Sequence, residues 1–196
     1  HPPGGRHTVT TMMAGVRREW MREFVLRDNR IFDAQIIASL RQGTAFFAST
    51  SILAVGGVLA LIGNVQPLTG LAAEIGRETP ALLWQLRLLP AALLLTHAFL
   101  KFVWANRVFG YASVTMGAVP SDPRDPRAMR RAMQAAELII RAAINFSRGL
   151  RSMYFALASL AWLAGAVTLM LAAVLVAGFL ALREFTSVPH DILEGE

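Results

Sequence analysis

The chain of 196 residues contains no cysteine, a single lysine and few charged residues of any kind. The absence of cysteine excludes a disulfide scaffold, a thiolate metal site and a cysteine nucleophile. Charged residues make up 16% and hydrophobic residues 55% of the chain, both outside the usual range for a soluble domain. This composition also excludes a disordered chain. The length fits one domain, and we expect a single membrane domain over residues 1–196.

Reaction motifs are missing as well. The sequence contains no P-loop, no Gly-x-Gly-x-x-Gly, no His-Glu-x-x-His and no Gly-x-Ser-x-Gly. We therefore predict no catalytic residue, no metal and no cofactor. The 19 basic and 13 acidic residues give a net charge of +6, which can indicate a nucleic-acid partner. We exclude that partner because the basic residues are segregated beside apolar segments, as membrane topology requires.

Three windows without charge organise the chain: residues 42–73, 88–100 and 152–182. A membrane-spanning helix needs about 20 mostly apolar residues. The windows predict an all-α, polytopic membrane helical bundle with spans at residues 44–62, 82–104 and 160–182. The second span is long enough only if Arg87 and Lys101 extend their charged groups to the interface. The third window is too long for one untilted crossing, so we expect residues 152–159 at or just inside the interface.

The distribution of basic residues predicts the orientation. Seven basic residues precede the first span, and nine lie between Lys101 and Arg151. By the positive-inside rule, residues 1–43 and the loop 105–159 are cytoplasmic. The first inter-span loop and the tail 183–196 are then on the outer side. We expect a multi-pass protein of the bacterial inner membrane.

The cytoplasmic segments show the pattern of amphipathic helices. Asp125 is a good N-cap residue and Pro126 suits the first helical position. The polar residues that follow recur at spacings of three and four, which predicts a helix that lies in the headgroup plane or packs on the spans. In the N-terminal segment, Trp20 contributes to an apolar face, and Glu23 and Arg27 are spaced for an i,i+4 pair.

Ionisable residues near the membrane are the candidate lipid or partner contacts. His97 and Lys101 share a helix face and form either an anion or proton site, or a structural pair. In the structural alternative, which we favour, Lys101 extends to the surface and His97 hydrogen-bonds a neighbouring helix. Asp33 is expected to be buried and paired with a cation, because an unpaired charge near hydrocarbon is costly. The arginines expected to converge around it are Arg30, Arg107, Arg141, Arg148 and Arg151.

Small residues at a spacing of four predict close helix packing. The pairs are Gly56 with Ala60, and Ala161 with Gly165. Such faces serve internal packing or contact with another membrane protein.

Several sequence blocks resemble one family. They begin with Trp-Met-Arg-Glu at residues 20–23 and continue at residues 27–33, 46–50, 101–107 and 145–151. Their combination and order are similar to the domain of unknown function 599, a family of integral membrane proteins of bacteria and plants. The resemblance implies a membrane protein and no established activity. Members of that family usually carry one more span ahead of the Trp-Met block, so we expect an upstream segment before His1 and four spans in the full protein.

Three functions fit these observations. The first is a non-enzymatic accessory or structural subunit that packs against other membrane proteins or itself, with membrane lipids as further partners. The second is a small transporter or channel, which would require an oligomer because two or three spans are few for a pore. The third is a lipid-modifying membrane enzyme with His97 or Asp33 as base, and it is the weakest because no nucleophile or metal set accompanies them.

Overall fold

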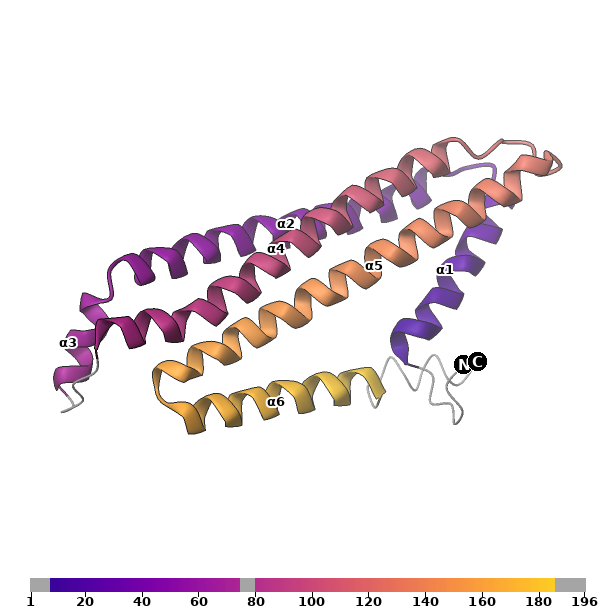
Figure 1. The fold of residues 1–196 in the computed structure, drawn as a ribbon. Coiled ribbons are helices and arrows are strands. Elements are labelled where there is room, and N and C mark those ends of the chain that lie inside the picture. The colour runs from indigo at the N-terminus through magenta and orange to yellow at the C-terminus, as the bar shows by residue number, and fades with distance from the viewer. Residues whose placement is uncertain (1–7, 75–79, 186–196) are drawn as a thin grey trace. The chain divides into compact units, whose positions relative to one another are not determined.

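The computed structural model describes residues 8–74 and 80–185, and every regular element in these ranges is helical. This part of the chain forms six α-helices and one short 3₁₀ helix, and Figure 1 labels the α-helices. In chain order they are α1 (Val9–Leu26), α2 (Ile31–Gly63), α3 (Gln66–Glu74), α4 (Ala81–Gly117), α5 (Pro126–Leu160), η1 (Ala161–Leu163) and α6 (Ala166–Phe185). The predicted all-α class is confirmed.

The chain forms two compact units. Unit 1 consists of residues 1–45, 102–147 and 180–196, and unit 2 consists of residues 46–101 and 148–179. The long helices α2, α4 and α5 each contribute one end to each unit. The charge-free windows lie mainly in unit 2, and most of the arginines lie in unit 1.

Unit 1 is held together by the apolar face of α5. Its buried positions are mostly alanines, which let neighbouring helices approach closely, and they pack on α1 and α4. They are Ala128, Ala132, Ala135, Ala136, Ile139 and Ala142. The predicted amphipathic helix after Asp125 is therefore confirmed, and of the two expected locations its apolar face packs against other helices.

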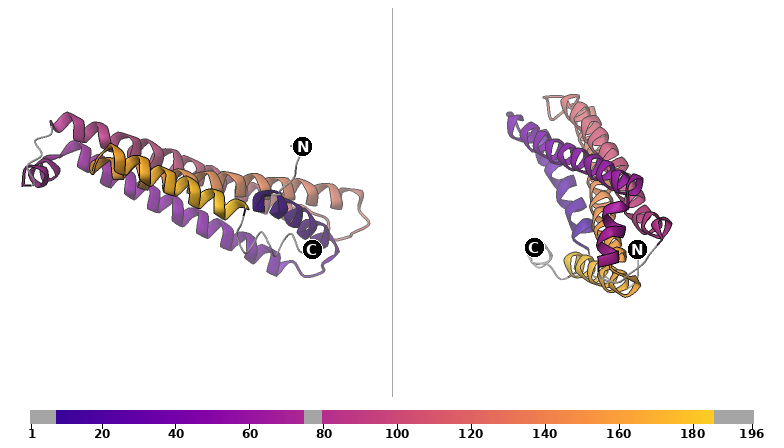
Figure 2. Two further views of the ribbon diagram at one scale, coloured as in Figure 1. Left: turned by 90° about the horizontal axis from the view of Figure 1, so that it is seen from below. Right: turned by 90° about the vertical axis from the view of Figure 1, so that its left-hand side faces the viewer.

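Unit 2 contains the apolar ends of α2, α4 and α5 and most of α6. Leu88, Leu95 and Ala156 belong to one buried cluster that joins α2, α4 and α5. After α5 the chain turns back through η1 into α6 (Figure 2). Gly165, with φ +144°, makes this turn in a backbone conformation that residues with a Cβ rarely adopt.

Three helices are long and apolar enough to cross a membrane: Ile31–Gly63, Ala81–Gly117 and Ala166–Glu184. The first two include the predicted spans 44–62 and 82–104. The third begins at Ala166 rather than at residue 160, because α5 continues without a break through residues 152–160. The expectation that residues 152–159 lie at or just inside the membrane interface stays a prediction. These residues pack inside unit 2, where Ala156 and Ser159 are buried.

The end of α6 contacts the start of α1. The hydroxyl of Thr10 donates a 2.7 Å hydrogen bond to Oε1 of Glu184, and both residues belong to unit 1. The sequence pattern placed these two segments on opposite sides of the membrane. Because two hydrogen-bonded side chains cannot be separated by a bilayer, this contact argues against opposite sides for Glu184 and the start of α1. Residues 186–196 lie outside the described residues, so the outer location of the tail 183–196 stays a prediction.

Candidate functional site

The break between α1 and α2 buries a carboxylate. Residues 27–30 interrupt the helix, and the side chain of Asn29 accepts the backbone N–H of Ile31 at the start of α2. This bend brings Asp33 back against α1. Its Oδ1 accepts 2.6 Å hydrogen bonds from Trp20 Nε1 and from Arg27 Nη1, and the Asp33 side chain is fully buried. Within the described residues, Oδ2 is buried without a hydrogen-bond partner.

The predicted burial and pairing of Asp33 are confirmed, but its cation is different from the expected ones. Arg27, which we expected to pair with Glu23, forms the ion pair with Asp33. Sequence reasoning missed Arg27 and Trp20 as partners because it treated the two helices as one approach to the span. The turn-forming pair Asp28-Asn29 is the signal that marks the break.

Arg30 fixes the end of α4 to the α1–α2 bend. Its Nη1 donates to the carbonyl oxygen of Val119 at 2.8 Å, and its Nη2 donates to that of Pro120 at 2.9 Å. The guanidinium also lies 4.5 Å from the centre of the Phe24 ring, a cation–π contact. The expectation that Arg30 surrounds Asp33 is wrong, because both of its terminal nitrogens bond to backbone carbonyls.

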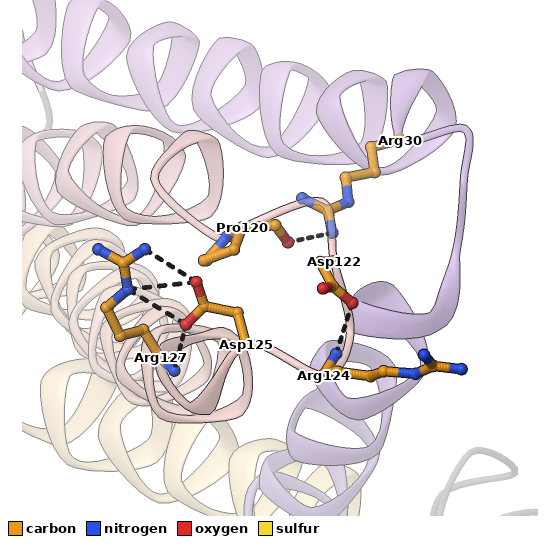
Figure 3. A network of polar contacts seen from close by, with 6 residues as sticks. All are labelled: Arg30, Pro120, Asp122, Arg124, Asp125 and Arg127. Atoms are coloured by element: carbon orange, nitrogen blue, oxygen red, sulfur yellow. Dashed lines mark hydrogen bonds and ion pairs between the residues drawn. The ribbon is translucent and has the colours of Figure 1, made fainter.

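The loop that follows α4 is ordered by its own carboxylates (Figure 3). Asp122 accepts the backbone N–H of Arg124 at 2.9 Å. Asp125 caps α5 by accepting the backbone N–H of Arg127 at 2.7 Å, and it also forms an ion pair with the Arg127 guanidinium at 2.8 Å. Hydrogen bonding from Arg127 lowers the pKa of Asp125 to about 2. The Arg127 side chain of this pair is exposed, and the contacts of Asp125 fix the start of α5.

A groove in unit 1 runs along α2 and α4. It has a volume of about 360 Å³ and lies between Arg30, which directly precedes α2, and Arg41 of α2. Its walls are largely apolar, and its remaining lining residues are Phe24, Ala34, Ile37, Ala38, Ser113, Met116 and Gly117. Arg41 extends across to α4, where a Cβ added at Gly110 would lie 3.9 Å from its guanidinium. Sequence analysis did not single out Arg41.

In unit 2, the polar contact of interest joins α4 and α5. Ser152 donates to the carbonyl oxygen of Leu94 at 2.8 Å, and its Oγ lies 3.1 Å from Nδ1 of His97. Since the serine hydrogen is directed at Leu94, Nδ1 of His97 must carry the proton that bonds to Ser152. The prediction that His97 hydrogen-bonds a neighbouring helix is confirmed. Lys101 is partly exposed.

The small-residue pairs behave differently from each other. Gly56 and Ala60 are exposed on α2, and a Cβ added at Gly56 would meet no atom within 4 Å. Ala161 and Gly165 belong to the turn between α5 and α6, not to one helix face. The prediction of a packing face for Ala161 and Gly165 is therefore wrong, because the 3₁₀ turn and the positive φ remove the i,i+4 register.

A family model described as "Protein of unknown function, DUF599" matches residues 2–189. The chain belongs to this family. No curated protein and no solved structure matches it. The predicted family is thereby confirmed, and the membership brings no activity and no functional residue with it.

The other arginines predicted to surround Asp33 are exposed in this DUF599 protein. Arg107 donates to the hydroxyl of Tyr111 at 2.6 Å, and Arg141, Arg148 and Arg151 are exposed. Within the described ranges, no three histidine, aspartate or glutamate side chains gather in a way that would hold a metal ion.

Proposed function

We propose that this chain is a non-enzymatic integral membrane protein that packs against another membrane protein or a second copy of itself, as an accessory or structural subunit. The observation that carries the proposal is the open face of α2. Gly56 and Ala60 lie one helical turn apart and are exposed, and an added side chain at Gly56 would meet nothing in its own chain. In lipid, helices associate through close van der Waals contact at such small residues.

The hydroxyls of unit 2 support this proposal over a transport path. Thr50, Ser51 and Thr96 each donate to a backbone carbonyl oxygen of their own helix. These bonds satisfy the hydroxyls without water, as the membrane interior requires. No feature of the described residues specifically favours the transporter or the lipid-modifying enzyme.

The proposed membrane placement follows from helix lengths and contacts. The 37 residues of α4 measure about 55 Å, well beyond a hydrocarbon core of about 30 Å. We place the charge-free residues of unit 2 in the bilayer of a bacterial inner membrane, with the last turns of α5 beside the spans α2, α4 and α6. The loop at residues 160–165 is then on the outer side, and the start of α1 and the end of α6 are both cytoplasmic.

The same placement assigns the basic residues to lipid. Arg148 and Arg151 are exposed immediately before the apolar end of α5. We propose that they and Arg107 contact anionic headgroups, because arginines at the cytoplasmic boundary attract them.

The test is purification from native membranes in mild detergent, followed by mass measurement and identification of co-purifying proteins. We expect a heterologous membrane protein or a homo-oligomer, and we expect the double variant Gly56→Leu, Ala60→Leu to lose it. Gly178→Leu is the matched control, since Gly178 is also open but lies on α6. A wild-type protein that purifies as a monomer alone, or a double variant that keeps its partner, would contradict the proposal.

A further inference from the structure

The groove of unit 1 has the features of a ligand site. Its volume of about 360 Å³ falls within the range of small-molecule pockets, which are mostly apolar with a few polar groups that fix orientation. Ala34 and Ala38 of α2 and Gly117 of α4 leave the space open because they carry no side chain beyond Cβ. Ile37 and Met116 are buried and provide its apolar floor.

The two cations of the groove have different roles. Arg30 is already bonded to two carbonyl oxygens and lies over the Phe24 ring, so it closes one end. Arg41 has no acidic partner within the described residues and is exposed at the other end. A guanidinium beside an apolar groove is complementary to an anion that carries an apolar chain. A carboxylate can accept two parallel hydrogen bonds from it.

The dimensions favour one acyl chain. Arg41 is eleven positions after Arg30, which corresponds to about 16 Å along the axis of α2. Arg41 is the last charged residue before the charge-free window 42–73. It therefore lies at the boundary of the apolar window, and the groove leads from Arg41 away from that window, so a chain bound in the groove would lie outside the bilayer. A phospholipid has two chains, and this is a single groove.

We propose that the groove between Arg30 and Arg41 binds a fatty acid, with its carboxylate on Arg41 and its chain along Ala38, Ala34 and Met116 toward Phe24. Burial of each methylene group contributes to affinity, so binding strengthens with chain length until the groove is filled. Phe24 and Arg30 then limit the length of the chain that fits. In the series octanoate, dodecanoate and hexadecanoate, affinity should rise with chain length until the groove is filled and should not rise further.

The experiment uses the full chain in discs of neutral phospholipid and a fatty acid with a photoreactive diazirine at its chain end. Cross-linked peptides are identified by mass spectrometry. We expect cross-links at Phe24, Ile37 or Met116, competed by dodecanoate but not by dodecanol, which has the same chain and no charge.

Two variants and a control complete the test. Arg41→Gln should reduce labelling at least tenfold, because it removes a charge-assisted hydrogen bond. Ala38→Phe should abolish labelling by filling the groove. Arg130→Gln, which removes an exposed arginine of α5 that does not line this groove, should label like the wild type. Circular dichroism checks folding, and Arg41→Gln alone decides the matter if Ala38→Phe does not fold. Three results would overturn the proposal. They are cross-links spread over α6, an equal loss of labelling in Arg41→Gln and Arg130→Gln, and competition by dodecanol equal to that by dodecanoate.

Discussion

The indole of Trp20 donates a 2.6 Å hydrogen bond to Oδ1 of Asp33, across the break between α1 and α2. The same oxygen accepts a bond from Arg27, whose side chain is 41% exposed, whereas that of Asp33 is fully buried. The bend is thus held by Oδ1 of Asp33, which accepts hydrogen bonds from the neutral Trp20 indole and from the charged Arg27 guanidinium.

The first prediction concerns this acceptor. Asp33→Ala leaves the Trp20 N–H without its acceptor, and we expect a loss of about 1–3 kcal/mol in the free energy of unfolding. Arg27→Ala should cost at least as much as Asp33→Ala, because it leaves the buried Asp33 carboxylate without its cation. The measurement is unfolding in mild detergent, with the exposed Arg131→Ala as control. An Asp33→Ala variant as stable as the wild type would contradict the arrangement.

The second prediction concerns topology, and the cysteine-free chain suits it because single cysteines can be introduced without background. Asn64→Cys and Ala164→Cys should react with an impermeant maleimide on intact cells. Ser121→Cys and Arg183→Cys should react only after permeabilisation. The reason is the Thr10–Glu184 hydrogen bond, which requires the two ends to share one side. Labelling of Arg183→Cys from outside would disprove the placement of α6.

The third prediction concerns the bond between α4 and α5. Ser152→Ala removes both the His97 contact and the bond to Leu94, and it should destabilise the protein by about 1 kcal/mol, as is usual for polar contacts between membrane helices. A double-mutant cycle with His97→Ala should give a coupling of roughly 0.6 kcal/mol. Ser159→Ala is the matched control, because Ser159 is buried but bonds to Ala156 of its own helix. A coupling of zero would mean that His97 and Ser152 are adjacent without interacting.

The fourth prediction is a pH dependence at the start of α5. Hydrogen bonding from Arg127 lowers the pKa of Asp125 from its ordinary 3.8 to about 2. A lowered pKa stabilises the folded state above the ordinary value, and this contribution is lost as the pH falls toward about 2. Asp125→Asn keeps the cap but not the charge. The excess thermal stability of the wild type over Asp125→Asn should therefore be present at pH 5 and disappear near pH 2. Arg127→Gln should remove the part of this pH dependence that comes from the guanidinium and keep the part that comes from the backbone N–H of residue 127. A difference that persists at low pH would exclude the ion pair as its cause.

Local signals predicted the helices well. The charge-free windows located three helices of sufficient length and hydropathy, and Asp125-Pro126 located the start of α5. These features depend on residues close together in the sequence: a cap acts on the next turn, and hydropathy acts on each helix separately.

The candidate sites were predicted less completely. The burial of Asp33 and the hydrogen bond of His97 to another helix followed from the cost of unsatisfied polar groups near hydrocarbon. The cation that pairs with Asp33 did not follow from that cost. The choice between Arg27 and Arg30 depends on how sharply the chain bends at residues 27–30. The groove at Arg41 carries no local pattern, because its walls come from helices more than 70 residues apart.

By itself, the sequence determined the helical class, the apolar spans and the family, since composition and short-range periodicity are sufficient for these. Only the tertiary structure decided that the end of α5 packs within the apolar unit and that the end of α6 contacts the start of α1. A charge count treats each apolar window as one crossing. The window at residues 152–182 is divided by the turn at Gly165, whose positive φ allows α6 to reverse direction, and the contacts of Ser152 and Glu184 then fix both halves.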